Sequence, residues 1–410
     1  MLSMWESKSF LSKWGVLLIF FSTLLESSAV DKPLGVFASS GASGEAIYEN
    51  PQLRGALVRT SWSDLEASPG SFNFASIDGQ ANQVKAQGLP WSLAVNAGGL
   101  GTPDWLLDQL NAPYFSYSFR GEAGYRLPLI WDPVVQLRMK LLAEALAERY
   151  GNDPLLQLVY VPQMTSNGIE GHLQGVDMSG FALAGYTDER WVTASIANAR
   201  NFALAFEQKA LAFEVHDING GSEVPMSIVE SLWQDEELAQ RVGAAVWWLS
   251  GKTSYQPDLL AALADFPGDI YAQLIGNSGQ ADRFAEENIA NAFQQGKALG
   301  VRYIEPWEYE FKYTALSANG AWDALLADFN TWANLEFASV SLPLDLAITE
   351  THLVLSGEWL AEDDLLQSSP DLQQWLPVEE AIYQNLPPAF LIERSSESFP
   401  TAQFYRVQPN

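Results

Sequence analysis

Two glutamates stand just after segments that read as buried strands, and they are the residues best suited to chemistry. Residues 155–161 (LLQLVYV) are almost all apolar and include β-branched Val159 and Val161; Glu170 follows after a short polar break. Residues 301–305 (VRYIE) end in Glu305. A carboxylate pair can cleave a glycosidic bond, because one group protonates the leaving oxygen while the other attacks the sugar or activates water.

Further polar candidates stand at or after the ends of predicted strands: Arg59, Asn96, His172, Asp217 and Glu308. The carboxyl ends of parallel strands meet at one end of an α/β barrel, so we expect these residues to lie near one site. His172 is a candidate for binding a sugar hydroxyl. Asp217 and Glu308 are the alternatives to Glu305 as second carboxylate, since Glu305 could instead belong to a structural ion pair.

The elements that must position these residues alternate along the chain. The predicted strands are residues 34–39, 55–62, 89–96, 155–161, 211–217, 244–250, 270–277 and 301–305. Segments whose apolar residues recur at helical spacing lie between many of these strands, at 77–87, 132–150, 188–209, 224–242 and 284–299. Residues 111–131 are predicted to form an irregular insertion. This alternation predicts a (β/α)8 barrel, a TIM barrel, over residues 30–338. The alternative is an open doubly wound sheet, but no GxGxxG phosphate loop is present.

From residue 342 to 410 the helical periodicity fades, and short apolar runs are separated by Ser, Pro and acidic residues. We expect a small all-β domain there, joined through a linker near 339–343. The fold is therefore predicted as α/β, with a barrel followed by this β-domain.

Tryptophans gather near the predicted strand ends, which suits a carbohydrate ligand. The candidates for sugar contact are Trp62, Trp105, Trp248 and Trp307. Aromatic rings pack against the C–H faces of sugars, although core packing is the simpler explanation for any one of them. Side chains alternate along a strand, so at least one of Trp247 and Trp248 must face away from the barrel interior.

Composition narrows the classes of partner and cofactor. The formal charge of −28 makes nucleic acid an unsuitable partner, because phosphate binding needs clustered Lys and Arg. The chain has no cysteine and three histidines, which argues against thiolate chemistry and against a zinc site. We expect an acidic protein that uses no metal and no cofactor, with an oligo- or polysaccharide as its partner.

The N-terminus resembles an export signal over residues 1–29. Lys8 and Lys13 precede an apolar run over 14–25, and small residues lead to Ala29. We expect cleavage after Ala29 and a mature protein that is secreted, periplasmic or at the cell surface. The apolar run is short for a membrane span, and an uncleaved anchor is the alternative reading.

Residues 55–106 resemble the N-terminal part of the barrel of family 42 β-galactosidases and related glycoside hydrolases. The parts that carry the resemblance follow in order: Arg59 and Trp62, Leu65-Glu66, Pro69-Gly70, Phe72 to Phe74, Ile77-Asp78, Gly88, and Pro103 to Trp105. The C-terminal region resembles small β-modules of secreted proteins from environmental bacteria.

This resemblance implies a secreted, retaining glycoside hydrolase in which Glu170 is the general acid and Arg59 keeps the second carboxylate ionised. The family places an Asn-Glu pair where this chain has Asn167-Gly168-Ile169-Glu170. The second carboxylate of the family ends strand seven, whereas here Glu305 ends the eighth predicted strand. Two readings from other classes stay open: a barrel that binds saccharide without catalysis, and a surface scaffold protein.

Overall fold

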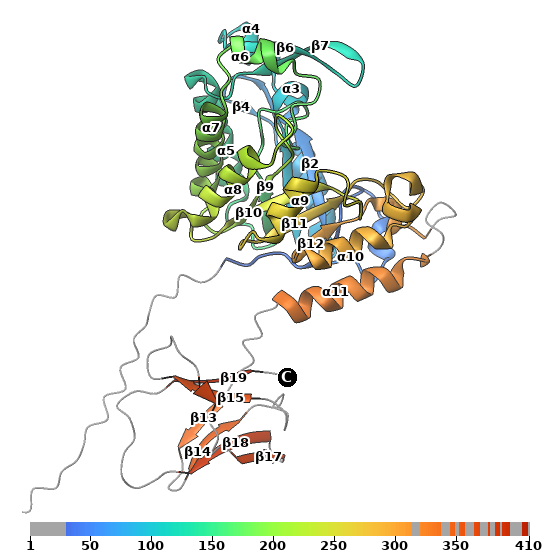
Figure 1. The fold of residues 1–410 in the computed structure, drawn as a ribbon, viewed down its shortest axis with the longest axis vertical. Helices are drawn as coiled ribbons and strands as arrows, with labels where there is room; N and C mark the ends of the chain where they lie inside the picture. The colour runs from blue at the N-terminus through green and yellow to red at the C-terminus, as the bar shows by residue number, and fades with distance from the viewer. Residues whose placement is uncertain are drawn as a thin grey trace, which may run out of the picture. The chain divides into compact units, whose positions relative to one another are not determined.

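The eight predicted strands form a closed parallel barrel in the computed structural model of the protein (Figure 1). Its strands are β1 (Gly35–Ala38), β2 (Gly55–Ser61), β5 (Trp91–Asn96), β8 (Leu156–Tyr160), β9 (Ala210–Glu214), β10 (Val242–Leu249), β11 (Ile270–Leu274) and β12 (Val301–Glu305). They pair in the order β1-β12-β11-β10-β9-β8-β5-β2, with β1 and β2 closing the ring. The predicted barrel is confirmed, and the open sheet is ruled out.

The structure describes residues 30–313 and 320–337, together with the backbone of seven strands between 345 and 408. The chain divides into two compact units, Met1–Phe337 and Ala338–Asn410. The predicted export signal lies outside the described residues. No helix in the described part of the chain is long and apolar enough to cross a membrane.

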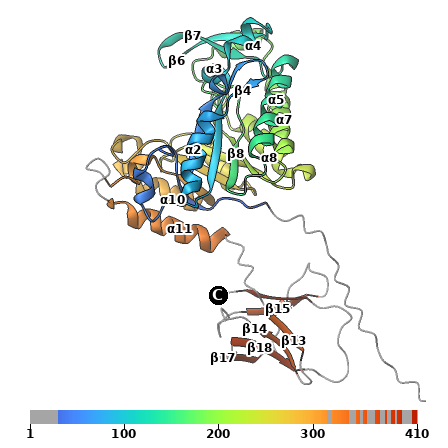
Figure 2. The same cartoon turned by 180° about the vertical axis from the view of Figure 1, so that it is seen from behind.

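Helices cover the outside of the barrel (Figure 2). The longer ones are α2 (Ala75–Ala86), α5 (Pro133–Tyr150), α7 (Asp188–Ala205), α8 (Glu223–Gln234), α9 (Pro257–Ala264), α10 (Ala290–Ala298) and α11 (Asp323–Phe337). Asp132 starts α5 as predicted, because its carboxylate accepts hydrogen bonds from the amides of Val134 and Val135. Gly88 follows α2 at φ +69°, the left-handed conformation that glycine adopts most easily after a helix.

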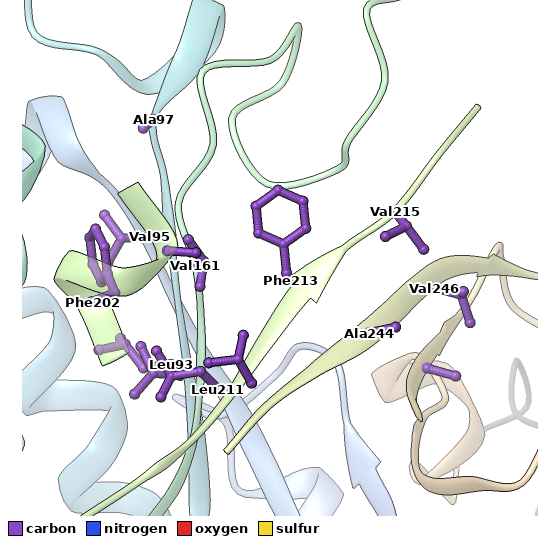
Figure 3. Packing of buried hydrophobic residues seen from close by; sticks show 14 of the residues in the cluster. Leu93, Val95, Ala97, Val161, Phe202, Leu211, Phe213, Val215, Ala244 and Val246 are labelled. Atoms are coloured by element: carbon purple, nitrogen blue, oxygen red, sulfur yellow. The ribbon is translucent and has the colours of Figure 1, made fainter. Parts of the chain in front are cut away.

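The strands bury two different faces. Phe37, Leu57, Tyr160, Tyr271 and Tyr303 are among the buried side chains that fill the interior of the barrel. The alternate residues of the same strands pack outward against the helices. Figure 3 shows Leu93, Val95, Leu211, Phe213 and Val246 of that outer layer, together with Phe202 of α7.

The connections after β2, β5 and β8 carry the largest insertions. They contain α1 (Trp62–Leu65), β3 (Glu66–Ser68), β4 (Ser71–Phe72), α3 (Gly98–Gly101), α4 (Asp104–Asp108), β6 (Tyr114–Phe119), β7 (Glu122–Pro128) and α6 (Met178–Leu183). The insertion predicted to be irregular is therefore largely an antiparallel hairpin of β6 and β7. The later residues of β6 alternate between exposed and buried, which is the pattern of a strand with one buried face.

Three predicted helices are shorter than expected, and the one predicted over 188–209 ends at Ala205. The helix predicted over 224–242 ends at Gln234 and is followed by the turn η2 (Glu236–Leu238), after which β10 starts at Val242. The one predicted over 284–299 begins at Ala290, because η3 (Ala281–Arg283) and η4 (Ala285–Glu287) occupy the preceding residues. Short turns η1 (Ala46–Glu49) and η5 (Glu308–Glu310) follow β1 and β12.

The C-terminal unit contains two antiparallel sheets. One has the order β13-β14-β18-β17 and the other β16-β15-β19. Their bounds are β13 (Asp345–Ile348), β14 (His352–Ser356), β15 (Leu365–Ser369), β16 (Leu376–Pro377), β17 (Ile382–Asn385), β18 (Pro388–Glu393) and β19 (Phe404–Gln408). The apolar runs expected to be strands fall within β14, β15, β18 and β19.

Candidate active site

The loop that follows β8 holds Glu170 between two neighbouring strand ends. Asn167 fixes the turn, since its side-chain oxygen accepts hydrogen bonds from the amides of Ile169 at 3.2 Å and Glu170 at 2.9 Å. Asn96, at the end of β5, donates to the Asn167 carbonyl at 3.1 Å. Asn96 therefore acts on the loop that carries Glu170, and it does not line the cleft described below.

Gly168 allows this loop to pack directly against the end of β5. Its φ is +90°, and a Cβ placed on it would lie 2.2 Å from the carbonyl oxygen of Ala97. Its own carbonyl accepts hydrogen bonds from the amides of Ala97 at 3.2 Å and Gln163 at 2.9 Å. The backbone on both sides is therefore fixed, and a side chain has no space to enter.

Replacing Gly168 by alanine should lower the free energy of unfolding by about 2–4 kcal/mol, because backbone strain and a steric clash add together. Gly124→Ala is the matched control: its φ is +94°, but a Cβ there has nothing within 4 Å. Urea unfolding of both variants measures the difference. Equal destabilisation of the two would show that the loop yields and that the contact with Ala97 does not constrain it.

Glu170 is partly buried, with 26% of its side chain exposed, and it carries a negative charge. Burial raises the pKa of its carboxyl, but the hydrogen bond from His172 and the charges of His216 and His172 outweigh burial, so the pKa lies below its usual value. His172 Nε2 lies 3.5 Å from the carboxylate. The general-acid role predicted for Glu170 needs a raised pKa, and this lowered pKa does not favour that role.

Behind Glu170 stands a buried pair that the sequence analysis did not identify, Glu214 and His216. Glu214 Oε2 lies 3.0 Å from His216 Nδ1, and Glu214 Oε1 accepts from the Trp247 amide at 2.9 Å. Burial lowers the pKa of His216, but the Glu214 charge and hydrogen bond raise it above its usual value. Strand alternation could have identified Glu214 as a residue that faces the barrel interior. It occupies alternate positions of β9 with Ala210 and Ala212, and these two alanines face the interior.

The side chains at the barrel mouth enclose a cleft with two compartments. The enclosed compartment, about 280 Å³, is lined by Arg120, Glu170, His172, Gln174, His216, Trp247, Trp248, Tyr255, Gln273, Leu274, Ile275, Arg283 and Trp307. The open compartment, about 400 Å³, is lined by His172, Leu173, Gln174, Met178, His216, Asp217, Ile218, Asn219, Tyr255 and Gln256. The two share four residues, including both histidines, and therefore adjoin.

Trp247 and Trp248 both reach the enclosed compartment although they are neighbours on β10. Trp247 belongs to the interior of the barrel and Trp248 to the outer layer, which agrees with the alternation argument. The register of β10 against β11 shifts between Val246 and Leu249, and such an irregularity re-aims side chains at a strand end. Sequence alternation alone therefore could not place both rings at one cleft.

Asp217 contributes the second carboxylate of the cleft. Burial and the negative charge of Asp258 raise the pKa of Asp217 above its usual value. Its Oδ1 is buried without a hydrogen-bond partner in the described part of the chain, which also favours the protonated form. The surroundings therefore shift the pKa of Asp217 upward and that of Glu170, in the same cleft, downward.

Glu305 lies at the end of β12 but beneath the cleft. It has no exposed surface, and it lines neither compartment. Burial raises its pKa to about 8, although hydrogen bonds from Tyr303 and Tyr160 and the charge of Arg59 oppose the shift. This shift favours the protonated form of Glu305, whereas the sequence predicted an ionised Glu305 with Arg59 as its partner; no ion pair joins the two side chains among the described residues.

The predicted binding residues divide between the cleft and other places. Trp307 and Trp248 line the enclosed compartment, and Trp307 donates to the Leu274 carbonyl at 3.0 Å. Arg59 is exposed, with its guanidinium 4.9 Å from the centre of the Trp247 ring. Glu308 pairs with Lys312 at 2.7 Å and does not line the cleft.

Trp62 and Trp105 are core residues, which corrects the prediction that they bind sugar. The Trp62 indole donates to the Glu66 carboxylate at 2.7 Å, and the Trp105 indole donates to the Glu66 carbonyl at 2.6 Å. Glu66 is fully buried and paired with Arg138. The motif around Glu66 therefore anchors the insertion after β2, away from the cleft.

Residues 30–313 and 320–337 contain no group of three His, Asp or Glu side chains placed to hold a metal ion. A further hollow of about 450 Å³ lies between α5 and α7, lined by Trp131, Gln136, Glu189, Arg190 and their neighbours. It contains a single carboxylate, Glu189, so it offers no carboxylate pair.

Comparison with known proteins supports the fold. No family model matches the sequence, and no curated protein matches it. The chain is similar to the catalytic domain of β-amylase from Paenibacillus polymyxa, at 10% identity and a TM-score of 0.50, over 75% of this chain and all of that one. It is also similar to endo-glycoceramidase II from Rhodococcus sp., at 13% identity and a TM-score of 0.48, over 92% and 96% of the two chains. At these identities the likeness concerns the barrel fold alone.

Proposed function

We propose that the chain is a glycoside hydrolase that cleaves O-glycosidic bonds in the cleft at the barrel mouth. One observation carries the proposal: Glu170 and Asp217 line one cleft, and their surroundings shift their pKa values in opposite directions. A pair of carboxyls separated in this way can act as a nucleophile or base and as an acid.

The structure suggests a role for each group. Glu170 is ionised, with His172 beside it, and attacks the sugar or activates a water. Asp217, whose pKa is raised by burial and by the charge of Asp258, donates the proton to the leaving oxygen. This assignment replaces Glu305 by Asp217 as second carboxylate, because Asp217 is on the surface of the cleft whereas Glu305 is not.

The walls of the cleft suit a sugar ring. Trp247, Trp248 and Trp307 offer apolar surfaces for its C–H faces, while Gln273 and Gln174 offer amides for its hydroxyls. We further propose export through the predicted signal, and a retaining outcome on the resemblance to family 42 β-galactosidases. A carboxyl separation of about 5–5.5 Å in the complex would give retention and about 6.5–9.5 Å inversion.

Turnover by the full-length protein on aryl glycosides and on polysaccharides tests the proposal. We expect hydrolysis of at least one saccharide, with the anomer of the first product read by NMR. Failure to hydrolyse any member of a broad panel, with the protein folded, would reject the hydrolase assignment.

The pH dependence of kcat/KM should identify the proton donor. The rate should rise as Glu170 ionises, below its ordinary pKa of 4.5, and fall as Asp217 loses its proton, above its ordinary value of 3.8. The optimum therefore lies on the acid side. A falling limb near pH 8 would instead identify Glu305, whose pKa is about 8.

Asp258→Asn provides the control for this profile. Asp258 raises the pKa of Asp217 through its charge and lines neither compartment. Its removal should move the falling limb to lower pH without changing the maximal rate by more than about two-fold. An unmoved limb would contradict Asp217 as the donor.

A non-catalytic saccharide-binding barrel is the second candidate. It is favoured by the end of β11, the seventh strand, where Gln273 lines the cleft and no carboxylate is present. Calorimetric binding of a saccharide that the protein never hydrolyses would support this candidate over the first.

A further inference from the structure

The arginines of the described chain differ in what their guanidinium groups contact. Those paired with carboxylates are Arg126, Arg138, Arg149, Arg200 and Arg302. Those that donate to backbone carbonyls are Arg54, Arg190 and Arg241. The guanidinium groups of Arg59, Arg120 and Arg283 have no hydrogen bond or ion pair within residues 30–313 and 320–337.

These three arginines gather at the cleft although they come from separate parts of the sequence. Arg120, in the turn between β6 and β7, and Arg283, in η3, both line the enclosed compartment. Arg59, on β2, lies over the ring of Trp247, which is a wall of the same compartment. One strand and two connections thus bring to one place guanidinium groups that have no partner among the described residues.

The charge of the whole chain makes this arrangement unexpected. The sequence has 50 Asp and Glu against 22 Lys and Arg, so carboxylates are in excess for pairing. The enclosed compartment nevertheless contains one carboxylate, Glu170, and His172 engages it. The compartment is therefore a locally positive site within a strongly negative protein, where the overall field opposes the approach of anions.

We propose that the cleft takes an anionic saccharide, one that carries a carboxylate or a sulfate ester, and that Arg120 and Arg283 bind the anionic group. The guanidinium fork matches the paired oxygens of either group, and Trp247, Trp248 and Trp307 hold the ring that carries it. This inference rests on the proposed function only for the saccharide nature of the ligand; it does not require hydrolysis.

Isothermal titration of the full chain with three trisaccharides of matched length tests the proposal: galactotriose, trigalacturonate and a sulfated galactotriose. All titrations use the Glu170→Gln background, so that no ligand is consumed. We expect one anionic ligand to bind at least about 10-fold more tightly than galactotriose, since a charged hydrogen-bonded pair contributes at that level. Comparison of trigalacturonate with the sulfated galactotriose shows whether the site prefers a carboxylate or a sulfate.

Substitution of the two arginines tests whether they cause the preference for the anionic ligand. Arg120→Gln with Arg283→Gln should reduce the preference for the anionic ligand to about two-fold or less, and should leave galactotriose binding within about two-fold. The control Arg54→Gln removes an exposed arginine that donates to Pro51 and should keep the preference. Increasing salt should weaken binding of the anionic ligand and leave galactotriose unaffected.

Each outcome decides between the two proposals. Equal binding of neutral and anionic ligands, or a preference that survives loss of both arginines, overturns the anionic assignment. Hydrolysis of neutral sugars by the wild type would then leave the hydrolase proposal standing. Tight, arginine-dependent binding of an anionic saccharide without turnover would support this inference and reject the hydrolase. Failure of all three trisaccharides to bind overturns the anionic assignment, while the broad substrate panel decides the hydrolase proposal separately.

Discussion

Replacing Glu170 by glutamine should lower the turnover of a saccharide substrate by about 10³-fold or more, because the amide can neither attack the sugar nor accept a proton from water. The side chain keeps its size, and its amide nitrogen replaces one carboxylate oxygen beside His172. We therefore expect a folded protein with little change in substrate binding. Steady-state kinetics and thermal unfolding of the same preparation measure the two effects.

Glu148→Gln is the matched control, since Glu148 is exposed on the outer face of α5. It should hydrolyse the substrate at the wild-type rate. Added azide should restore part of the activity of Glu170→Ala toward an aryl glycoside with a good leaving group, because the small anion can occupy the space of the missing carboxylate. A Glu170→Gln enzyme at near wild-type rate would remove Glu170 from the mechanism.

Glu305→Gln should remove a large pH dependence from the stability of the barrel. The pKa of Glu305 is raised from 4.5 to about 8 in the folded protein by burial. Between these values the unfolded chain releases the proton while the folded chain keeps it, so stability is complete below pH 4.5 and falls as pH rises toward 8. A shift of this size corresponds to roughly 5 kcal/mol.

Glutamine imitates the neutral acid, since its oxygen can accept from Tyr160 and Tyr303 as the carboxyl oxygen does. The variant should match the wild type below pH 4.5 and exceed it by several kcal/mol at pH 8. Urea unfolding of both proteins over this range gives the difference directly, because other titrating groups cancel. Parallel curves would mean that Glu305 is ionised in the folded protein.

The strands were predictable because each is an apolar segment with β-branched or aromatic residues that ends in polar or small ones. Residues 242–249, for example, are buried throughout, and the sequence predicts a strand over 244–250. The closure of the ring followed from the number and alternation of the elements. The hairpin of β6 and β7 was missed because its exposed positions gave a weaker pattern.

The candidate site was less predictable, since its geometry depends on contacts between loops. Glu170 was found because it follows a strand, yet its charge state depends on His172 and on His216, which lies just beyond the end of β9. Arg120 and Arg283 stand in turns where no periodic pattern marks them. Trp62 and Trp105 have the right spacing for a familiar motif, but Glu66 and Arg138 bind them into the core.

The tyrosines that fill the barrel interior give the protein an internal chromophore for its own unfolding. Burial raises the pKa values of Tyr160, Tyr271 and Tyr303 well above the ordinary value of 10.0. These phenols consequently stay neutral in alkaline solution, while exposed tyrosines ionise and show the ultraviolet absorbance of tyrosinate. After a jump to high pH, their ultraviolet absorbance should appear only at the rate at which the barrel opens, so a spectrophotometer can time that event without any attached label.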